Sequence, residues 1–239
     1  MFRLPALVQE RAVSFVIANG ENAANGAGIT SKIATRLLDG GVDVITTGNH
    51  VWRQREVFAF LASSDRILRP ANYPPSNPGR AVTVRPAKDG TDVAVVNLMG
   101  SLYIGAPVSP FRIVDELVTQ ASELADTVVV DFHAEATSEK VAMGHYLDGR
   151  VAAVVGTHTH VQTADATVLP KGTAYITDVG MTGPVDSVIG VKTEIILRRF
   201  LTEMPMPFEV ADGRVRINAV VIEVQGGRAL AIERLEEFV

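Results

Sequence analysis

VAAVVGTHTH, residues 151–160, places the strongest constraint on the fold of this chain. Its five leading apolar residues predict a buried strand that ends at Gly156, and His158 and His160 follow two positions apart. Side chains at i and i+2 of an extended backbone point the same way, so the two imidazoles are expected to converge beyond the strand's carboxyl end. Open α/β sheets place their sites at that edge, and imidazole is a common metal ligand. The stretch therefore indicates a metal site, with two histidines on an exposed loop tip as the alternative.

Composition predicts an ordinary globular α/β protein. The 239 residues are 47% hydrophobic and 21% charged, which favours a single domain, residues 1–239. The sequence shows neither a membrane span nor a signal peptide, so a cytoplasmic protein is expected. The absence of cysteine excludes thiolate ligands, leaving imidazole, carboxylate and carboxamide groups that suit manganese, iron or zinc. The net charge of -5 argues against stable nucleic-acid binding but is compatible with a small phosphorylated substrate.

Three other predicted strands end in similar side chains. Residues 14–18, 42–46 and 127–130 form compact apolar runs. The residues that follow them are, in order, Glu21 with Asn22, Asn49 with His50, and His133. Each set taken alone is also compatible with a turn, a helix-capping Asn or a capping His. Together with residues 151–160, they predict that four strand ends converge on one edge of the sheet.

The rest of the chain predicts alternating strands and helices. Thr30 is expected to cap a helix that runs to the glycine pair at 40–41. Residues 81–85 and 93–98 predict a hairpin, and the last part of the chain predicts antiparallel strands. Further helices are predicted near residues 1–12, 52–61, 111–124, 136–147 and 193–201, and a further strand near 172–177.

The collected side chains predict a reaction as well as a metal site. One carboxylate able to bridge, surrounded by six further polar groups, indicates two metal ions, ~4 Å apart in sites of this type. Paired metals clamp a phosphoryl group and lower the pKa of a bridging water enough to form hydroxide at neutral pH. Hydrolysis of a phosphoester is the reaction that such a predicted dinuclear site suits best.

Six segments in this order resemble the YmdB-like family, a branch of the calcineurin-like metallophosphoesterases. They are SFVIANGENAANGAGIT, VDVITTGNHVW, RPANYP, DFHAEATSEK, VVGTHTHVQTAD and AYITDVGMTGPVDSVIG, and the resemblance covers nearly the whole chain. The resemblance implies a four-layer α/β/β/α sandwich. It also implies a phosphodiesterase that acts on 2′,3′-cyclic or 3′,5′-cyclic nucleotide monophosphates with two iron or manganese ions, zinc being the third option.

The resemblance also implies a role for each polar residue at the strand ends. Glu21 would bridge the two metals. Asn22 and His160 would bind the first metal, whereas Asn49, His133 and His158 would bind the second. His50 would be the general acid that protonates the leaving alkoxide during attack by the bridging hydroxide, a role typically contributing about 10²–10⁴-fold.

One family feature is absent from this sequence. Members open with a strand that ends in a Gly-Asp pair, and its Asp binds the first metal, whereas no Asp precedes Glu21 here. Residues 1–12 match the helix that follows that strand. We therefore expect a gap in a sheet, low occupancy of the first metal and reduced or absent hydrolysis, with the second metal bound independently.

Two other functional interpretations remain open at this stage. A non-catalytic nucleotide-binding or regulatory protein would keep the shape with an incomplete metal site, and metal content with turnover separates it from an enzyme. A metal-dependent amidohydrolase also uses a His-x-His pair, but on its first strand, whereas this pair lies late in the chain. Apolar terminal strands leave a homo-oligomer open as well.

Overall fold

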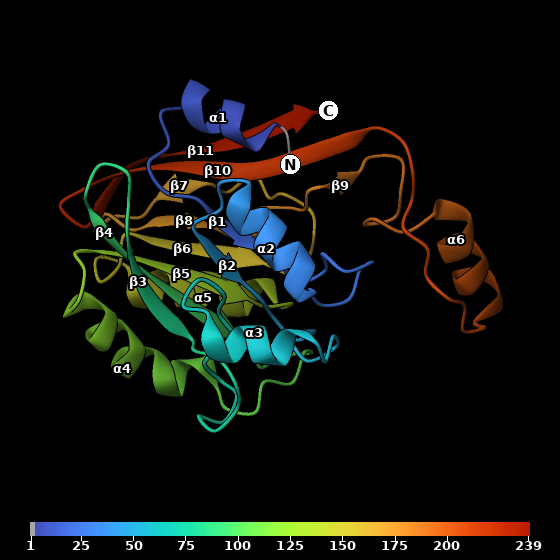
Figure 1. Ribbon diagram of the computed structural model, residues 1–239, viewed down its shortest axis with the longest axis horizontal. Helices are drawn as coiled ribbons and strands as arrows, with labels where there is room; N and C mark the ends of the chain where they lie inside the picture. The colour runs from blue at the N-terminus through green and yellow to red at the C-terminus, as the bar shows by residue number, and fades with distance from the viewer. Residues whose placement is uncertain (1–2) are drawn as a thin grey trace.

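A computed structural model describes residues 3–239 and shows three β-sheets (Figure 1). The largest has the strand order β3-β4-β5-β6-β8-β7, in which β4, β5, β6 and β8 are parallel and the two edge strands are antiparallel to their neighbours. Its strands are β3 (Val82–Pro86), β4 (Asp92–Met99), β5 (Thr127–His133), β6 (Ala153–Thr157), β7 (Thr167–Val168) and β8 (Ala174–Ile176).

Two smaller sheets and six helices complete the described part of the chain. One sheet is the parallel pair β1 (Ile17–Asn19) and β2 (Val44–Thr46). The other is antiparallel and contains β9 (Gly183–Pro184), β10 (Val215–Gln225) and β11 (Arg228–Phe238). The helices are α1 (Leu4–Glu10), α2 (Ser31–Asp39), α3 (Val57–Ser63), α4 (Pro110–Ser122), α5 (Thr137–Leu147) and α6 (Thr193–Thr202).

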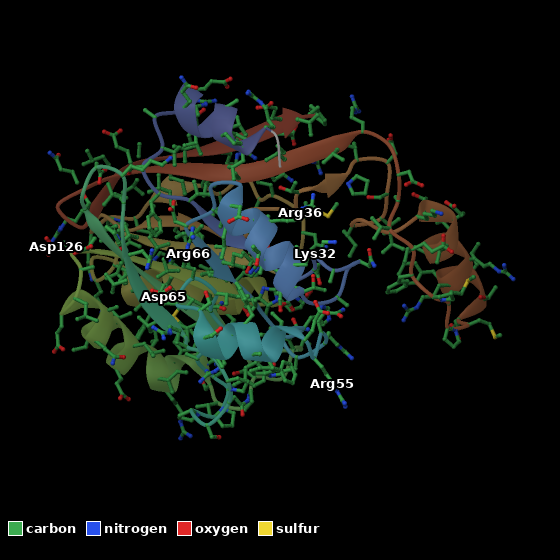
Figure 2. The ribbon with its side chains drawn as sticks, viewed as in Figure 1. Lys32, Arg36, Arg55, Asp65, Arg66 and Asp126 are labelled. Atoms are coloured by element: carbon green, nitrogen blue, oxygen red, sulfur yellow. The ribbon has the colours of Figure 1, made fainter. Side chains whose placement is uncertain are left out.

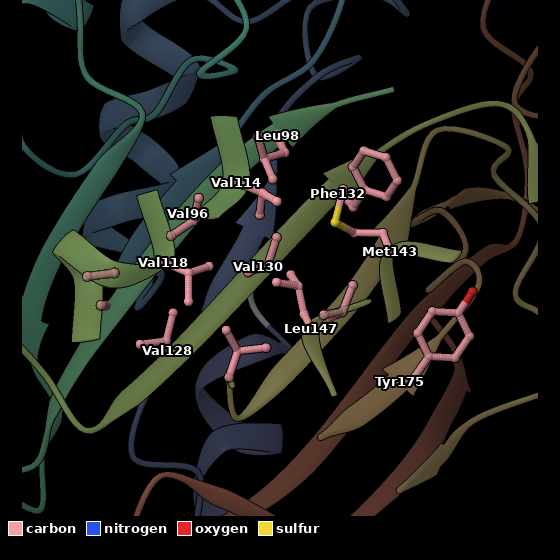
Figure 3. Close-up of a cluster of buried hydrophobic side chains, with 14 of the residues drawn as sticks. Val96, Leu98, Val114, Val118, Val128, Val130, Phe132, Met143, Leu147 and Tyr175 are labelled. Carbon is pink, nitrogen blue, oxygen red and sulfur yellow. The ribbon is translucent and has the colours of Figure 1, made fainter. Parts of the chain in front are cut away.

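Helices α4 and α5 cover one face of the six-stranded sheet. Val114 and Val118 from α4, and Met143 and Leu147 from α5, pack against inward-facing strand residues such as Val130 (Figure 3). Fully burying aliphatic side chains of this size contributes about 1.5–3 kcal/mol each. This cluster therefore holds helices α4 and α5 against the strands of the sheet, some of which carry the predicted site residues at their carboxyl ends.

The opposite face of the six-stranded sheet packs against the two smaller sheets. Val44 of β2 lies in one cluster with Val93 and Val95 of β4, and Ala229 of β11 lies in another with Ala153 and Ala174. Helices α2 and α3 pack on the outer side of β1 and β2, through a cluster that also contains Ile29, Ala34, Val42, Ile45, Val57 and Leu61. The α/β class and the four-layer arrangement implied by the resemblance are therefore confirmed.

The outer helices are amphipathic. Ala34 of α2 is buried, whereas Lys32 and Arg36 are exposed on its surface, as is Arg55 just before α3 (Figure 2). Helix α1 lies over β11 (Figure 1), where Arg3 pairs with Glu237 and Arg11 with Glu233. The helix expected near residues 1–12 is thus present as Leu4–Glu10, and residues 1 and 2 lie outside the described part.

The element boundaries expected at Gly156 and at Trp52 were wrong. Gly156 does not end its strand, because β6 continues to Thr157. A Cβ at position 156 would lie 1.7 Å from the backbone oxygen of Thr177, so the glycine permits a close approach of two backbones. The helix expected from Trp52 begins only at Val57, and a hydrogen bond from Gln54 Nε2 to the Ala27 oxygen (2.9 Å) ties the preceding turn to the loop after β1.

The cap at Thr30 was predicted correctly, and we expect it to stabilise the protein. Thr30 Oγ1 accepts a hydrogen bond from the Ile33 backbone N–H at 3.2 Å, which satisfies one of the free N–H groups at the start of α2. Thr30→Ala is expected to lower the free energy of unfolding by about 1 kcal/mol in urea denaturation. Thr30→Ser, which keeps the acceptor, should stay close to wild type, and equal losses in both variants would contradict this account.

Strand register brings the polar residues to one edge. Met99 at the end of β4 pairs with His133 at the end of β5, and His133 pairs with Thr157 at the end of β6. The parallel pair β1 and β2 also ends together, with Asn19 beside Thr46. The segments that follow these strands therefore begin at neighbouring points.

Candidate metal centre

The structure brings the predicted side chains together where β1, β2, β5 and β6 end. They are Glu21 and Asn22 after β1, Asn49 and His50 after β2, His133 as the last residue of β5, and His158 and His160 after β6. All seven are linked by hydrogen bonds or close polar contacts within this set. Convergence of the four strand ends is thus confirmed.

Glu21 is the central residue of this edge. Its side chain is 2% exposed, and its Oε1 accepts the His50 backbone N–H. The same oxygen lies 3.5 Å from His50 Nδ1 and 3.5 Å from His133 Nε2. The other oxygen, Oε2, is buried and has no hydrogen-bond partner among residues 3–239. A buried carboxylate oxygen without a partner is costly, and a bound cation would satisfy it.

Asn49, His133 and His158 form one donor group beside Glu21. His133 Nε2 lies 3.1 Å from Asn49 Oδ1 and 3.1 Å from His158 Nδ1. Burial, followed by the proximity of His133 and Lys140, lowers the pKa of His158 to about 4. His158 is therefore neutral near pH 7 and has a lone pair for a metal, as imidazole ligation requires.

Asn22 and His160 form a second donor group on the other side of Glu21. The Asn22 carboxamide lies 2.9 Å from His160 Nε2 and 2.9 Å from His50 Nδ1. Burial lowers the pKa of His50, and the nearby Glu21 carboxylate acts in the opposite direction. The structure thus separates the donors into the same two groups that the resemblance implied, with Glu21 and His50 between them.

The extended geometry predicted for residues 158–160 was wrong. His158 has φ +105° and His160 has φ +68°, so the backbone is left-handed at both positions. The two imidazoles consequently enter different donor groups and do not converge on a single point. Both conformations are uncommon for residues other than glycine and need support from their surroundings.

A buried ion pair provides that support. Lys140 Nζ donates to Asp178 Oδ2 at 2.8 Å, and both side chains are 1% exposed. Asp178 also accepts the backbone N–H of Thr159 at 2.9 Å and its hydroxyl at 2.8 Å. Thr159, the residue between the two histidines, is therefore anchored by hydrogen bonds to Asp178 in the segment after β8.

A second buried network orients His133. Its Nδ1 lies 2.9 Å from Thr157 Oγ1, and that hydroxyl donates to Asp131 Oδ1 at 2.7 Å. Asp131 also accepts hydrogen bonds from Thr46 and Asn19, and burial raises its pKa. Because the Thr157 hydroxyl proton goes to Asp131, the hydroxyl accepts from His133 Nδ1–H, and Nε2 is left with the lone pair.

Sequence reasoning missed these supporting residues. Asp131 gave the clearest signal, as a carboxylate that interrupts the apolar run of β5. Gly48 gave a weaker one: a Cβ there would lie 2.2 Å from His133 Nε2, so only glycine fits beside that ring. Lys140, Thr157 and Asp178 carried no signal that separated them from surface or turn residues.

Tyr73 and Trp52 lie beside this edge. Their rings pack edge to face with centroids 5.3 Å apart. Burial, and then the negative charge of Glu21, raises the pKa of Tyr73. The tyrosine therefore remains a neutral hydroxyl close to the carboxylate.

The donor residues suit divalent metals, although their side chains do not yet surround a common point. Within residues 3–239, no three His, Asp or Glu side chains already surround a common point as metal ligands do. Two of the donors are carboxamides, which add no charge to such a set, and Glu21 Oε2 still lacks a hydrogen-bond partner in the described part of the chain. Nitrogen and oxygen donors of this kind suit manganese, iron and zinc.

No helix in the described range is long and apolar enough to cross a bilayer.

Comparisons with known proteins show similarity along nearly the whole chain. A model of the family described as YmdB-like protein matches residues 2–235. A Bacillus subtilis relative is named 2′,3′-cyclic-nucleotide 2′-phosphodiesterase and is 48% identical to this chain. The alignment covers 97% of this chain and 88% of the relative. The crystal structure of a hypothetical protein from Thermus thermophilus has a TM-score of 0.92 and 46% identity, covering 99% of this chain and 92% of that one. The crystal structure of a novel phosphatase from Mycoplasma pneumoniae has a TM-score of 0.90 and 34% identity, covering 99% of this chain and 86% of that one. The chain therefore belongs to the YmdB-like family.

Proposed function

We propose that this protein is a metal-dependent phosphodiesterase that hydrolyses cyclic nucleotides, either 2′,3′-cyclic or 3′,5′-cyclic monophosphates. The observation that carries the proposal is the buried Glu21 carboxylate, with one oxygen unpartnered within residues 3–239, between two groups of nitrogen and oxygen donors. The name of the Bacillus subtilis relative supports a cyclic phosphodiester as the substrate. All the proposed site residues fall in one domain, residues 1–239.

The residues divide between two metals, iron or manganese, with zinc as the third option. Glu21 would contact both. Asn22 and His160 would hold the first, and Asn49, His133 and His158 the second. When bound, such a pair neutralises phosphoryl oxygens and supplies an activated water as nucleophile.

His50 is proposed as the general acid. It lies between the donor groups, with its backbone N–H on Glu21 and its Nδ1 near the Asn22 carboxamide. Its ring is 28% exposed, so a substrate can reach it from solvent. In this role the imidazolium would donate a proton to the leaving alkoxide oxygen as the phosphorus–oxygen bond breaks.

Metal titration followed by turnover on the same sample tests the proposal. Metal-free protein is titrated with manganese, bound metal is measured by elemental analysis, and hydrolysis of 2′,3′-cyclic AMP is followed at each step. Because the second group offers three donors besides Glu21 and the first offers two, we expect one tight and one weaker equivalent. Turnover should rise as the weaker equivalent binds and disappear with a chelator.

Other results of this titration would change the interpretation. Two bound equivalents without turnover on any cyclic nucleotide would favour a nucleotide-binding protein. Turnover that is independent of metal would overturn the proposal. A 3′,5′-cyclic substrate in the same assay decides between the two phosphodiester classes.

Thr157→Val should weaken binding of the proposed second metal, because Thr157 orients His133. The substitution keeps the shape of the side chain but removes the hydroxyl that orients the ring. We expect manganese affinity to fall about 10–100-fold, as for other hydrogen-bonding partners of metal ligands. Thr167→Val, at an exposed position on β7, is the matched control and should bind as wild type does. Equal affinities in both variants would remove Thr157 from this role.

A further inference from the structure

Glu135 is a charged residue beside the candidate metal centre that the proposed function does not use. It lies in the short link between His133, the last residue of β5, and Thr137, the first residue of α5. Its Oε2 is 3.1 Å from His158 Nε2. No Lys or Arg pairs with this carboxylate within residues 3–239. The group that Glu135 contacts is therefore an imidazole of the site.

The backbone on both sides of Glu135 is fixed. Ala134 and Ala136 are buried, whereas the Glu135 side chain is 48% exposed. The Ala134 N–H donates to the Thr157 oxygen at 3.3 Å, and the Ala136 oxygen accepts the Lys140 N–H at 3.1 Å. The link is thus tied to β6 at one end and to the first turn of α5 at the other, which holds the carboxylate beside the ring.

The two nitrogens of the His158 ring face different groups. Nδ1 lies 3.1 Å from His133 Nε2, inside the second donor group, and Nε2 lies 3.1 Å from the Glu135 carboxylate. A neutral imidazole carries its proton on one nitrogen and a lone pair on the other. A proton on Nδ1 would lie between the two histidines and block the nitrogen that faces the donor group. A proton on Nε2 would leave Nδ1 free.

The charge of Glu135 favours the second tautomer. A proton on Nε2 meets a carboxylate oxygen, whereas a lone pair there would face its negative charge, and such a partner decides which ring nitrogen is protonated. We propose that Glu135 is a positioning residue, which accepts the Nε2–H of His158 and leaves the Nδ1 lone pair for the second metal. The assignment of that metal to His158 rests on the proposed function. His133 has the equivalent arrangement, because its Nδ1–H is directed to Thr157.

The tautomer is measured in the metal-free protein, so this test does not depend on the proposed function. Long-range proton–nitrogen NMR spectra of protein labelled with ¹⁵N-histidine distinguish the ring nitrogens near pH 7, and His158→Gln assigns the signals of His158. We expect the Nε2–H tautomer in wild type and a shift towards Nδ1–H in Glu135→Ala. Glu135→Gln, whose amide oxygen can still accept, should keep Nε2–H. A proton on Nδ1 in wild type, or an unchanged tautomer in Glu135→Ala, would overturn the proposal.

Manganese affinity is the second readout. In calorimetric titration, Glu135→Ala should weaken the tighter equivalent about 10–100-fold, and Glu135→Gln should lose much less. Glu116→Ala, at an exposed acidic residue of α4, is the matched control and should bind as wild type does. Equal affinity in Glu135→Ala and wild type would refute this role alone. A wild type that binds no manganese would refute the proposed function together with it.

Discussion

Glu21→Gln is expected to reduce manganese-dependent turnover by more than about 100-fold, because it removes the carboxylate proposed to hold both metals, and loss of a group that merely orients a metal ligand already costs about 10–100-fold. The substitution keeps the size of the side chain and its acceptor for the His50 N–H, but removes the negative charge between the two donor groups. Metal-dependent stabilisation should disappear with it. Manganese should raise the melting temperature of wild type and leave that of the variant nearly unchanged.

The metal-free proteins provide an independent comparison. Because Glu21 Oε2 is buried without a partner in the described part of the chain, the neutral amide should leave the metal-free variant at least as stable as wild type. Glu123→Gln, an exposed residue at the end of α4, is the matched control and should change neither activity nor metal response. Retention of full manganese-dependent turnover by Glu21→Gln would exclude Glu21 as a bridging ligand.

His50→Ala is expected to lower turnover of a 2′,3′-cyclic nucleotide about 10²–10⁴-fold. Metal content should stay at the wild-type level, because His50 lies beside the two donor groups and is proposed as a member of neither. Bis-para-nitrophenyl phosphate releases a phenolate that needs little protonation, so its hydrolysis should fall much less. The comparison of the two substrates in one preparation measures the proton transfer itself.

His145→Ala is the control for this substitution. His145 is the histidine outside the site and is exposed on α5. It should retain both activities. A uniform loss on both substrates in His50→Ala, or a loss of bound metal, would show that His50 acts as a ligand or in substrate positioning, and not as an acid.

Much of the site was predictable because each donor follows a local pattern. An apolar run followed by Asn, His or Glu marks a strand end, and parallel strands bring such ends together. The cap at Thr30 and the hairpin of β3 and β4 were predictable for the same reason, since each depends on a few adjacent residues.

The supporting networks were not predictable from local patterns. Lys140 and Asp178 are separated by 38 residues, and Thr157 meets Asp131 only because β5 and β6 pair in one register. The left-handed turns at His158 and His160 depend on these contacts, so the spacing of the two histidines alone misled the prediction. The sequence likewise predicted a helix near residues 193–201, but the exposure of most of its residues is a tertiary property.

The single residue between His158 and His160 has a consequence for the choice of metal. The two histidines belong to different donor groups, and Thr159 is anchored between them on the Lys140–Asp178 pair. The separation of the groups is therefore set by covalent chain length and a buried anchor, before any ion arrives. For the proposed metal site, exchanging manganese for iron or zinc would then leave this spacing fixed.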